Sequence, residues 1–239
     1  MIVDVLIPCY IDQVFPDTAH NMIKVLETLG CGVNYNPNQT CCGHPAFING
    51  FWDECKPVGE KLIKEFQNER YIVCPSSMCT GMVKNNYQQL FHNSSLHNEY
   101  KSVQKNMYEF SDFLVNVLNV SNLNATFAAK AVYLHSCKAV RELNIKQAPV
   151  TLLNNVKELE LIELNDDYAC CGYDMAFTNQ MEEISVAIAR RKIETIKATG
   201  AQLIISADYT CLMHLGGVIK KDGLDIKCMH IADVLAVNM

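Results

Sequence analysis

The motif CCGHPAF (41–47) recurs as CCGYDMAF (170–177) in the second half of a chain of 239 residues. Three further pairs of similar segments accompany the motif and keep the same order in both halves. These pairs are IVDVLIPCY (2–10) with AVYLHSCKAV (131–140), YIVCPSSMCTGM (71–82) with LIISADYTCLMHL (203–215), and SDFLVNVL (111–118) with ADVLAV (232–237). Such ordered self-similarity indicates an internal duplication. We therefore predict two pseudo-symmetric lobes, residues 1–125 and 126–239.

Apolar, β-branched runs alternate with helical patterns in each half of the chain. The longest helical pattern in the second half occupies about 180–199 and is closed by Gly200. Strands that alternate with helices predict an α/β fold in which each lobe is a parallel sheet flanked by helices. The predicted strands are 2–7, 33–36 and 71–74 in the first lobe, and 131–135, 159–163 and 202–206 in the second.

Cysteines follow the predicted strands in both lobes. In an open α/β sheet the loops after the carboxyl ends of parallel strands line one crevice, so thiols that are far apart in sequence converge there. Gly43 and Gly172 suit a loop that exposes two adjacent sulfurs and lets the backbone approach a bound group. The predicted ligands are Cys9, Cys41, Cys42 and Cys79 in the first lobe, and Cys137, Cys170, Cys171 and Cys211 in the second.

Four thiolates are the ligand count of a [4Fe–4S] cluster, whose iron–sulfide core prefers sulfur donors. We therefore expect two such clusters, one in each lobe. The C-x2-C pairs that are typical of structural zinc sites do not occur in the sequence. A zinc site and redox-active thiols without a metal are the alternatives.

Two further side chains are possible additional ligands. Cys74 ends a predicted strand five residues before Cys79, and His214 lies one helical turn after Cys211. A helix cap or a hydrogen-bond donor behind the ligands is the alternative role of His214. For His44, next to the first CCG motif, we expect a hydrogen bond to sulfur. The remaining cysteines are expected to pack as small apolar residues; they are Cys31, Cys55 and Cys228.

Composition narrows the class of protein. Hydrophobic residues make up 49% of the chain and charged residues 19%, which is enough for a sizeable core. The net charge of −6 and the lack of a basic run argue against a nucleic-acid partner. We find no apolar stretch long enough to span a bilayer and no signal peptide. Twelve cysteines, with two adjacent pairs among them, fit a disulfide framework poorly, so we expect a cytoplasmic protein.

These segments together resemble the cysteine-rich CCG iron–sulfur family over essentially the entire chain. The family includes the CCG-bearing subunit of heterodisulfide reductase and the glycolate oxidase iron–sulfur subunits, and the similarity is greatest to the lactate utilisation protein A type. The resemblance implies cluster-binding lobes and an electron-transfer role in a three-component cytoplasmic system that oxidises L-lactate to pyruvate. The matching stretches are PCYIDQVFP (8–16), QTCCGHPAF (39–47), PSSMCTGM (75–82), HSCKAVREL (135–143), CCGYDMAF (170–177) and SADYTCLMHLGG (206–217).

The sequence departs from one branch of this family. The heterodisulfide reductase branch ends each unit with C-x-x-C, whereas Met82 and His214 occupy the last position here. The resemblance therefore favours an electron-transfer subunit of a lactate- or glycolate-oxidising complex over a thiol or disulfide reductase. A zinc-stabilised interaction module is the third alternative. No dinucleotide fingerprint or P-loop is present, so we expect other protein subunits to supply the site of lactate chemistry.

Overall fold

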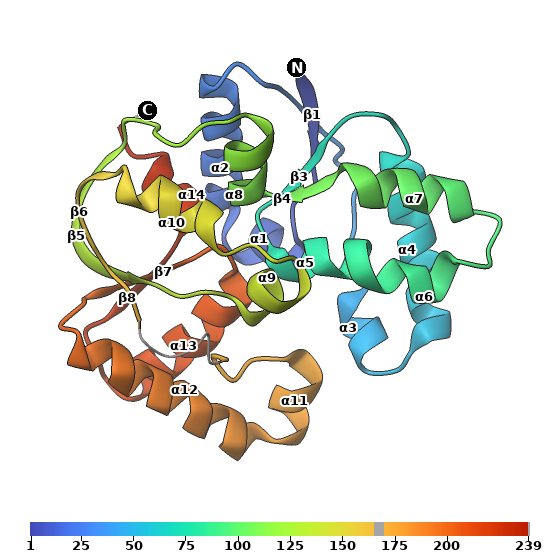
Figure 1. The fold of residues 1–239 in the computed structure, drawn as a ribbon. Coiled ribbons are helices and arrows are strands. Elements are labelled where there is room, and N and C mark those ends of the chain that lie inside the picture. The colour runs from blue at the N-terminus through green and yellow to red at the C-terminus, as the bar shows by residue number, and fades with distance from the viewer. Residues whose placement is uncertain (165–169, 239) are drawn as a thin grey trace.

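The computed structural model describes residues 1–164 and 170–238, which form two parallel sheets of four strands (Figure 1). The first sheet comprises β1 (Ile2–Val5), β2 (Gly32–Tyr35), β3 (Ile72–Cys74) and β4 (Met107–Glu109). The second comprises β5 (Thr126–Tyr133), β6 (Lys157–Ile162), β7 (Leu203–Ser206) and β8 (Lys227–His230). Val, Ile and Leu dominate the central strands β1, β3 and β7, as expected of parallel strands that are buried on both faces.

The two sheets share one topology. The strand order is β2-β1-β3-β4 in the first and β6-β5-β7-β8 in the second, and every neighbouring pair is parallel. Each strand of one lobe therefore has a counterpart in the other. The predicted α/β fold with two lobes is confirmed, while the boundary between residues 125 and 126 stays a prediction.

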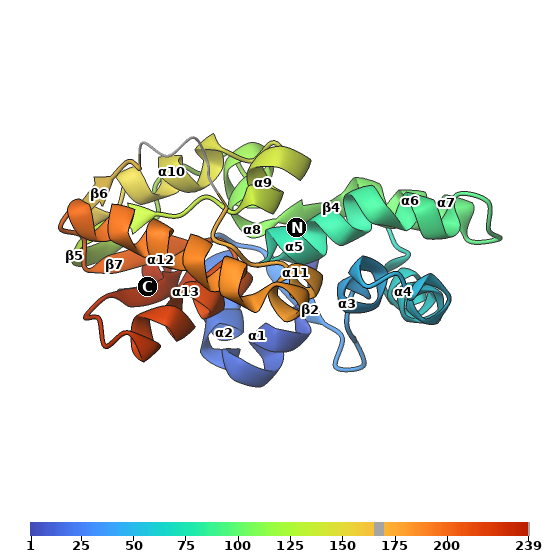
Figure 2. The same cartoon turned by 90° about the horizontal axis from the view of Figure 1, so that it is seen from below.

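Helices cover both faces of each sheet (Figure 2). In each lobe the second strand pairs on one side of the first strand and the third strand pairs on the other side. Because successive crossovers run in opposite directions, the preferred right-handed connection puts their helices on opposite faces of the sheet. In the first lobe the helices are α1 (Cys9–Val14), α2 (Pro16–Thr28), α3 (His44–Ile48), α4 (Trp52–Phe66), α5 (Ser77–Gly81), η1 (Met82–Asn86), α6 (Tyr87–Phe91), α7 (His97–Asn106), α8 (Phe110–Asp112) and η2 (Phe113–Val117). In the second they are α9 (Cys137–Glu142), α10 (Gln147–Asn154), α11 (Met175–Gln180), α12 (Glu182–Ala198), α13 (Tyr209–Lys221) and α14 (Ile231–Leu235). Over the described ranges, every helix is too short or too polar to cross a membrane.

The fourth strand of each sheet was not predicted. β4 has the sequence MYE and β8 has KCMH, so neither carries a run of β-branched residues. Each pairs on one side only, with the central strand β3 or β7. Short edge strands of this kind depend on the neighbouring strand more than on their own sequence.

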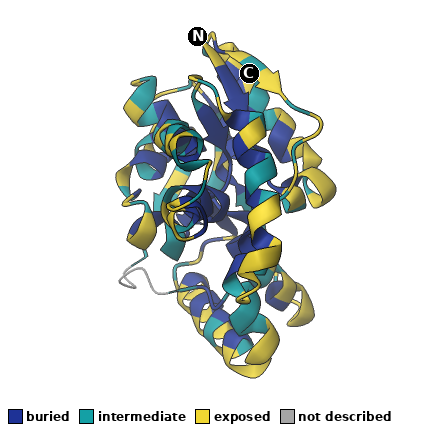
Figure 3. Cartoon of the chain, turned by 90° about the vertical axis from the view of Figure 1, so that its right-hand side faces the viewer, coloured by how far each residue is buried: buried dark blue, intermediate teal, exposed yellow. Residues whose placement is uncertain are grey.

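Among the described residues, two large apolar cores and one small cluster fill the interior, and one of the large cores includes residues of both lobes. Val3 and Val5 of β1 belong to the shared core, whereas Leu6 and Ile72 belong to a core on the other face of the first sheet. Figure 3 shows the buried residues concentrated on the strands and on the helix surfaces that face them. The lobes are therefore parts of one packed body.

The contact between α2 and α14 joins the lobes through the shared core (Figure 1). Phe15, just before α2, stacks on Tyr209 with ring centroids 3.9 Å apart. Asp233 of α14 accepts hydrogen bonds from Thr18 Oγ1 and Asn21 Nδ2 of α2, each at 2.9 Å. Helices from opposite ends of the chain thus hold the two sheets together.

This contact predicts a measurable stability change. Replacing Asp233 by Ala leaves the donors of Thr18, Asn21 and Tyr209 without their acceptor, so we expect the free energy of unfolding to fall by about 1–3 kcal/mol. Denaturation with urea would measure it. The exposed Asp225 provides a control, because Asp225→Ala should change stability by less than about 0.5 kcal/mol. Equal losses in the two variants would contradict the role given to Asp233.

Candidate functional site

The first lobe brings its four predicted ligand cysteines together. Cys9 is the first residue of α1, the helix that follows β1, and Cys79 lies in α5, the helix that follows β3. Cys41 and Cys42 lie on the loop between β2 and α3. All four line one cavity of about 180 Å³. Three separate segments that follow the carboxyl ends of β1, β2 and β3 therefore supply one thiol site.

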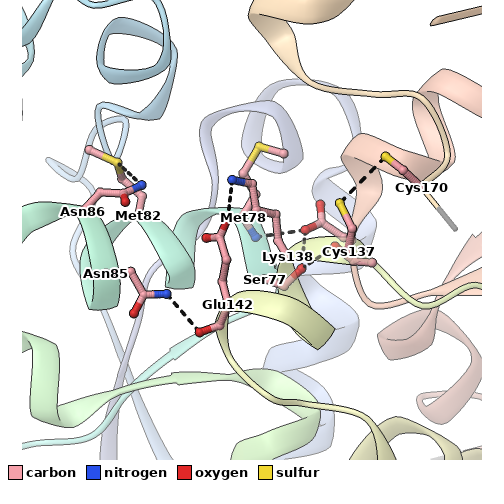
Figure 4. A network of polar contacts seen from close by, with 11 residues as sticks. Ser77, Met78, Met82, Asn85, Asn86, Cys137, Lys138, Glu142 and Cys170 are labelled. Atoms are coloured by element: carbon pink, nitrogen blue, oxygen red, sulfur yellow. Dashed lines mark hydrogen bonds and ion pairs between the residues drawn. The ribbon is translucent and has the colours of Figure 1, made fainter. Parts of the chain in front are cut away.

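The second lobe has an equivalent arrangement. Cys137 is the first residue of α9, after β5, and Cys211 lies in the first turn of α13, after β7. Cys137 Sγ lies 3.9 Å from Cys170 Sγ (Figure 4). The Cys171 thiol interacts with the thiols of Cys170 and Cys211. The order Cys137, Cys170, Cys171, Cys211 thus corresponds to Cys9, Cys41, Cys42, Cys79 in the first lobe.

Each CCG motif depends on its glycine. Gly43 has a φ of 87° and Gly172 a φ of 93°, in the left-handed region that favours glycine. A Cβ atom would lie 2.8 Å from Cys55 Sγ at the first position and 2.6 Å from the Ser185 carbonyl oxygen at the second. Both positions therefore exclude larger residues through conformation and through close packing.

The residues behind the two loops are also equivalent. The Cys55 thiol of α4 donates a hydrogen bond to the Gly43 carbonyl oxygen at 3.3 Å. In the second lobe the Ser185 hydroxyl of α12 donates to the Gly172 carbonyl oxygen at 2.7 Å. Both side chains are fully buried. Cys55 thus supports the loop from behind, as expected for a structural cysteine, and serine already fills this place in the other lobe.

One sulfur in the first lobe is stabilised as a thiolate. Hydrogen bonds from the Cys42 and Cys9 thiols hold the pKa of Cys41 below its ordinary value, although burial opposes the shift. The Gly43 N–H, 3.4 Å from Cys41 Sγ, adds to the effect. The same contacts raise the pKa values of Cys9 and Cys42, because both thiols hydrogen-bond to Cys41 and both are partly or wholly desolvated.

The second lobe repeats this pattern. Hydrogen bonds from Cys137 and Cys171 lower the pKa of Cys170, and the Gly172 N–H lies 3.4 Å from the Cys170 sulfur. The pKa values of Cys137 and Cys171 are raised, in both cases chiefly by the hydrogen bond to Cys170. In each lobe the first cysteine of the CCG motif therefore has a lowered pKa, while the neighbouring thiols that hydrogen-bond to it have raised pKa values.

The two possible additional ligands lie behind the thiol sites. His214 Nε2 is 3.2 Å from Ser185 Oγ and 3.4 Å from the Ser185 carbonyl oxygen, so this nitrogen faces α12. Cys74 is fully buried, and its thiol interacts with that of Cys79. Cys74 is not among the residues that line the cavity. These positions support a bracing role for both side chains, and their ligation stays a prediction.

Sequence reasoning missed the contribution of the second lobe to the first cavity. Four second-lobe side chains line it; they are Tyr173, Met175, Thr210 and Met213. Tyr173 directly follows the second CCG motif, and Thr210 and Met213 flank Cys211. Their closeness in sequence to the second ligand set indicates a role near the thiols of the second lobe, whereas the structure places them in the cavity of the first lobe. The first thiol site therefore faces the second lobe.

The first cavity fits a group held by thiolates. Its donors are four soft sulfur atoms, and its remaining walls are mostly apolar or aromatic. His44 also lines it, is 3% exposed, and has an Nε2 atom without a hydrogen-bond partner among the described residues. Within the same residues, no three Cys, His, Asp or Glu side chains are arranged to hold a single metal ion. The donor set, the glycine loop and the free imidazole nitrogen suit a group larger than one ion.

The difference in thiol pKa values predicts a labelling order. In the reduced protein without metal, Cys41 and Cys170 should be alkylated first near neutral pH, because the thiolate is the reactive form and both are partly exposed. Cys42 and Cys171, with raised pKa values and little exposure, should react much later and gain rate as pH rises. Peptide mass mapping over time would measure the order. Labelling of Cys42 as fast as Cys41 would contradict it.

A solved structure supports the fold. A hypothetical protein from Helicobacter pylori superposes with a TM-score of 0.64 at 12% identity. The match covers 100% of this chain and 49% of that one, so this chain spans about half the length of its structural relative. At this identity the similarity concerns the fold alone.

Curated relatives match over nearly their full length. Lactate utilization protein A 2 of Bacillus cereus (strain Q1) is 36% identical over 240 residues, covering 100% of this chain and 99% of the relative. Lactate utilization protein A of Geobacillus sp. (strain WCH70) is 37% identical, and that of Bacillus subtilis (strain 168) is 36% identical; each match covers 98% of this chain and 99% of the relative. Residues 3–84 and 131–216, one segment in each lobe, match the cysteine-rich domain family CCG. The chain belongs to this CCG family, with lactate utilization protein A among its full-length relatives.

Proposed function

We propose that the chain binds two [4Fe–4S] clusters, one in each lobe, and transfers electrons as a subunit of a lactate-oxidising system. The observation that carries the proposal is the pair of equivalent thiol sets at the carboxyl ends of two sheets with the same strand order. Thiolates are the usual ligands of iron–sulfur clusters. A duplicated site of this kind supports two centres in one chain.

The side chains have distinct roles in this proposal. Cys9, Cys41, Cys42 and Cys79 would hold the first cluster, and Cys137, Cys170, Cys171 and Cys211 the second. A bound cluster supplies one-electron redox chemistry. Binding displaces protons from the thiols whose pKa values are raised, so uptake should release protons. The apolar walls of the first cavity exclude water, and His44 Nε2 is available to donate a hydrogen bond to sulfur.

Lactate is the proposed substrate of the whole system. Full-length relatives carry the name lactate utilization protein A. The chain itself has no fingerprint for a flavin or nicotinamide, so other cytoplasmic subunits would oxidise L-lactate to pyruvate and pass on the electrons. Cys9 is exposed, which supports electron exchange with a partner at the surface of the first site.

Disulfide-reductase chemistry has less support. It would use a fifth cysteine in each unit, at the positions of Met82 and His214. Met82 is 1% exposed and packs in the first-lobe core, with its sulfur 3.6 Å from Asn86 Nδ2 (Figure 4). His214 is directed toward Ser185. Met82 is thus used for packing and His214 for contact with Ser185, and this supports the electron-transfer role.

Substitution of single cysteines tests the ligand assignment. Cys42→Ser should remove or cripple the cluster of the first lobe, and Cys171→Ser that of the second, because a hydroxyl is a poorer ligand for the iron–sulfide core. Each variant should keep about half of the iron and sulfide that the wild type takes up anaerobically. EPR of the reduced proteins would show which centre remains.

Cys55→Ser is the matched control. Serine already makes the corresponding hydrogen bond at Ser185, so the first CCG loop should be preserved and the iron content should equal that of the wild type. Iron loss from Cys55→Ser as large as that from Cys42→Ser would disprove the ligand assignment. A wild-type protein that binds zinc and no sulfide would favour the zinc module instead.

The place of the chain in a larger system is tested by activity. The purified chain, loaded with iron and sulfide, should not oxidise L-lactate with an artificial electron acceptor. Activity should appear when the other components of the system are added, because they supply the site of lactate chemistry. The control is the same mixture with the Cys42→Ser chain, which should be inactive or strongly impaired. Lactate oxidation by the single chain would overturn the subunit role.

A further inference from the structure

A buried carboxylate lies where the two lobes meet. Asp208 is fully buried and caps α13, the helix that carries Cys211. Its Oδ1 accepts hydrogen bonds from the Thr210 N–H at 3.1 Å and from the Thr210 hydroxyl at 2.8 Å. Aspartate is a favoured residue at this position of a helix. Within its own lobe, Asp208 thus fixes the start of the last ligand helix.

The second oxygen of this carboxylate serves the first lobe. Asp208 Oδ2 accepts hydrogen bonds from the Ser77 hydroxyl at 2.6 Å and from the Met78 N–H at 2.9 Å. Both donors lie in the first turn of α5, and the next residue is Cys79. Unpaired N–H groups at the start of a helix favour an anion. A residue of the second lobe therefore holds the helix that presents a first-lobe ligand.

The network around Asp208 reaches two further ligand loops. Tyr10, which follows Cys9, donates a hydrogen bond from its hydroxyl to Ser76 Oγ at 2.7 Å and lies 3.5 Å from Asp208 Oδ1. Ser76 Oγ in turn accepts from the Cys79 N–H at 3.3 Å.

On the other side of Asp208, Ser77 Oγ lies 3.0 Å from Ser136 Oγ, and Ser136 precedes Cys137. In Figure 4, Ser77 and Met78 lie close to Cys137 of the other lobe. Residues next to three of the predicted ligands, together with the cap of the helix that carries Cys211, thus belong to one buried network.

The internal duplication shows what is unusual about Asp208. Ser76 of SSMC (76–79) occupies the corresponding cap position in the first lobe, where it serves its own helix. A hydroxyl offers one oxygen, whereas a carboxylate offers two and accepts several hydrogen bonds at once. Asp208 can therefore cap α13 and also hold α5. Its counterpart Ser76 caps only its own helix, so the cap of the second lobe reaches the first lobe but not the reverse.

We propose that Asp208 is a positioning residue for both thiol sites, and that it makes the geometry of Cys79 in the first lobe dependent on the second lobe. The proposal rests on the cluster-binding role given above. Its consequence is that the two sites are not independent, although their ligands come from separate lobes. Loss of Asp208 should disturb the first site as well as its own.

The test compares two buried aspartates. Asp208→Asn keeps the volume but replaces one acceptor oxygen with a donor, which cannot satisfy the donors of both helices. Asp4→Asn is the control, because Asp4 is 2% exposed and accepts from Asn34, Asn68 and Arg70 on the amino-terminal side of the first sheet. Asp4→Asn should lower the stability of the chain without changing the positions of the ligand helices α5 and α13.

The first readout needs no bound cluster. In the reduced protein without metal, Cys79 is 5% exposed and Cys211 is 4% exposed, so both should be alkylated slowly in the wild type. Asp208→Asn should accelerate labelling of Cys79 about tenfold, the effect of about one lost buried hydrogen bond. Asp4→Asn should leave this rate at the wild-type value. Equal acceleration in the two variants, or none in Asp208→Asn, would overturn the proposal.

The second readout isolates the first site in a Cys171→Ser background. Asp208→Asn in that background should lose most of the remaining iron and sulfide, while Asp4→Asn should retain them.

If Asp208→Asn does not fold, Ser77→Ala removes one of the same contacts and should also accelerate Cys79 labelling. An unchanged rate there would also overturn the proposal. A wild type that takes up no iron and sulfide would refute the cluster-binding role, while the labelling comparison would still decide the role of Asp208.

Discussion

Parallel pairing of a central strand with two neighbours is the interaction on which each lobe depends. Because β1 lies between β2 and β3, the loops that follow these three strands leave the sheet at one edge. The same holds for β5 between β6 and β7. Backbone hydrogen bonds between the strands therefore decide where the thiols lie, before any bound group could gather them. An antiparallel neighbour would send its cysteine to the opposite edge.

The loops that carry the CCG motifs place two adjacent sulfurs at one site. The left-handed glycine after each pair turns the chain sharply and returns its N–H to the first sulfur. A side chain of α4 or α12 then holds the glycine carbonyl oxygen from behind. The donor is a thiol in the first lobe and a hydroxyl in the second. The lobes have thus kept the geometry of the loop while changing the residue that braces it.

Packing between the lobes gives the two duplicated thiol sites different surroundings. Each copy has its own sheet and its own thiols, yet one apolar core runs through both, and second-lobe side chains line the first cavity. The opposed surfaces have diverged, with His44 next to one CCG motif and Tyr173 next to the other. Burial of the first site against the second lobe lowers its exposure to water, which strengthens local electrostatic interactions. Duplication followed by divergence of the facing surfaces accounts for two similar sites in unequal surroundings.

The repeat, the α/β class and the central strands can be predicted from the sequence alone, because they depend on local periodicity and on motifs that can be compared along the chain. The sequence also identified the cysteines that converge, since parallel sheets impose that convergence. Only the tertiary structure revealed the edge strands β4 and β8, whose short sequences carry little signal of their own. The same is true of Asp208, which resembles an ordinary helix cap in sequence and shows its second set of partners only after folding. Contacts between the lobes join residues that are far apart in sequence and depend on how the folded lobes pack together. Local sequence patterns within either lobe do not specify that packing.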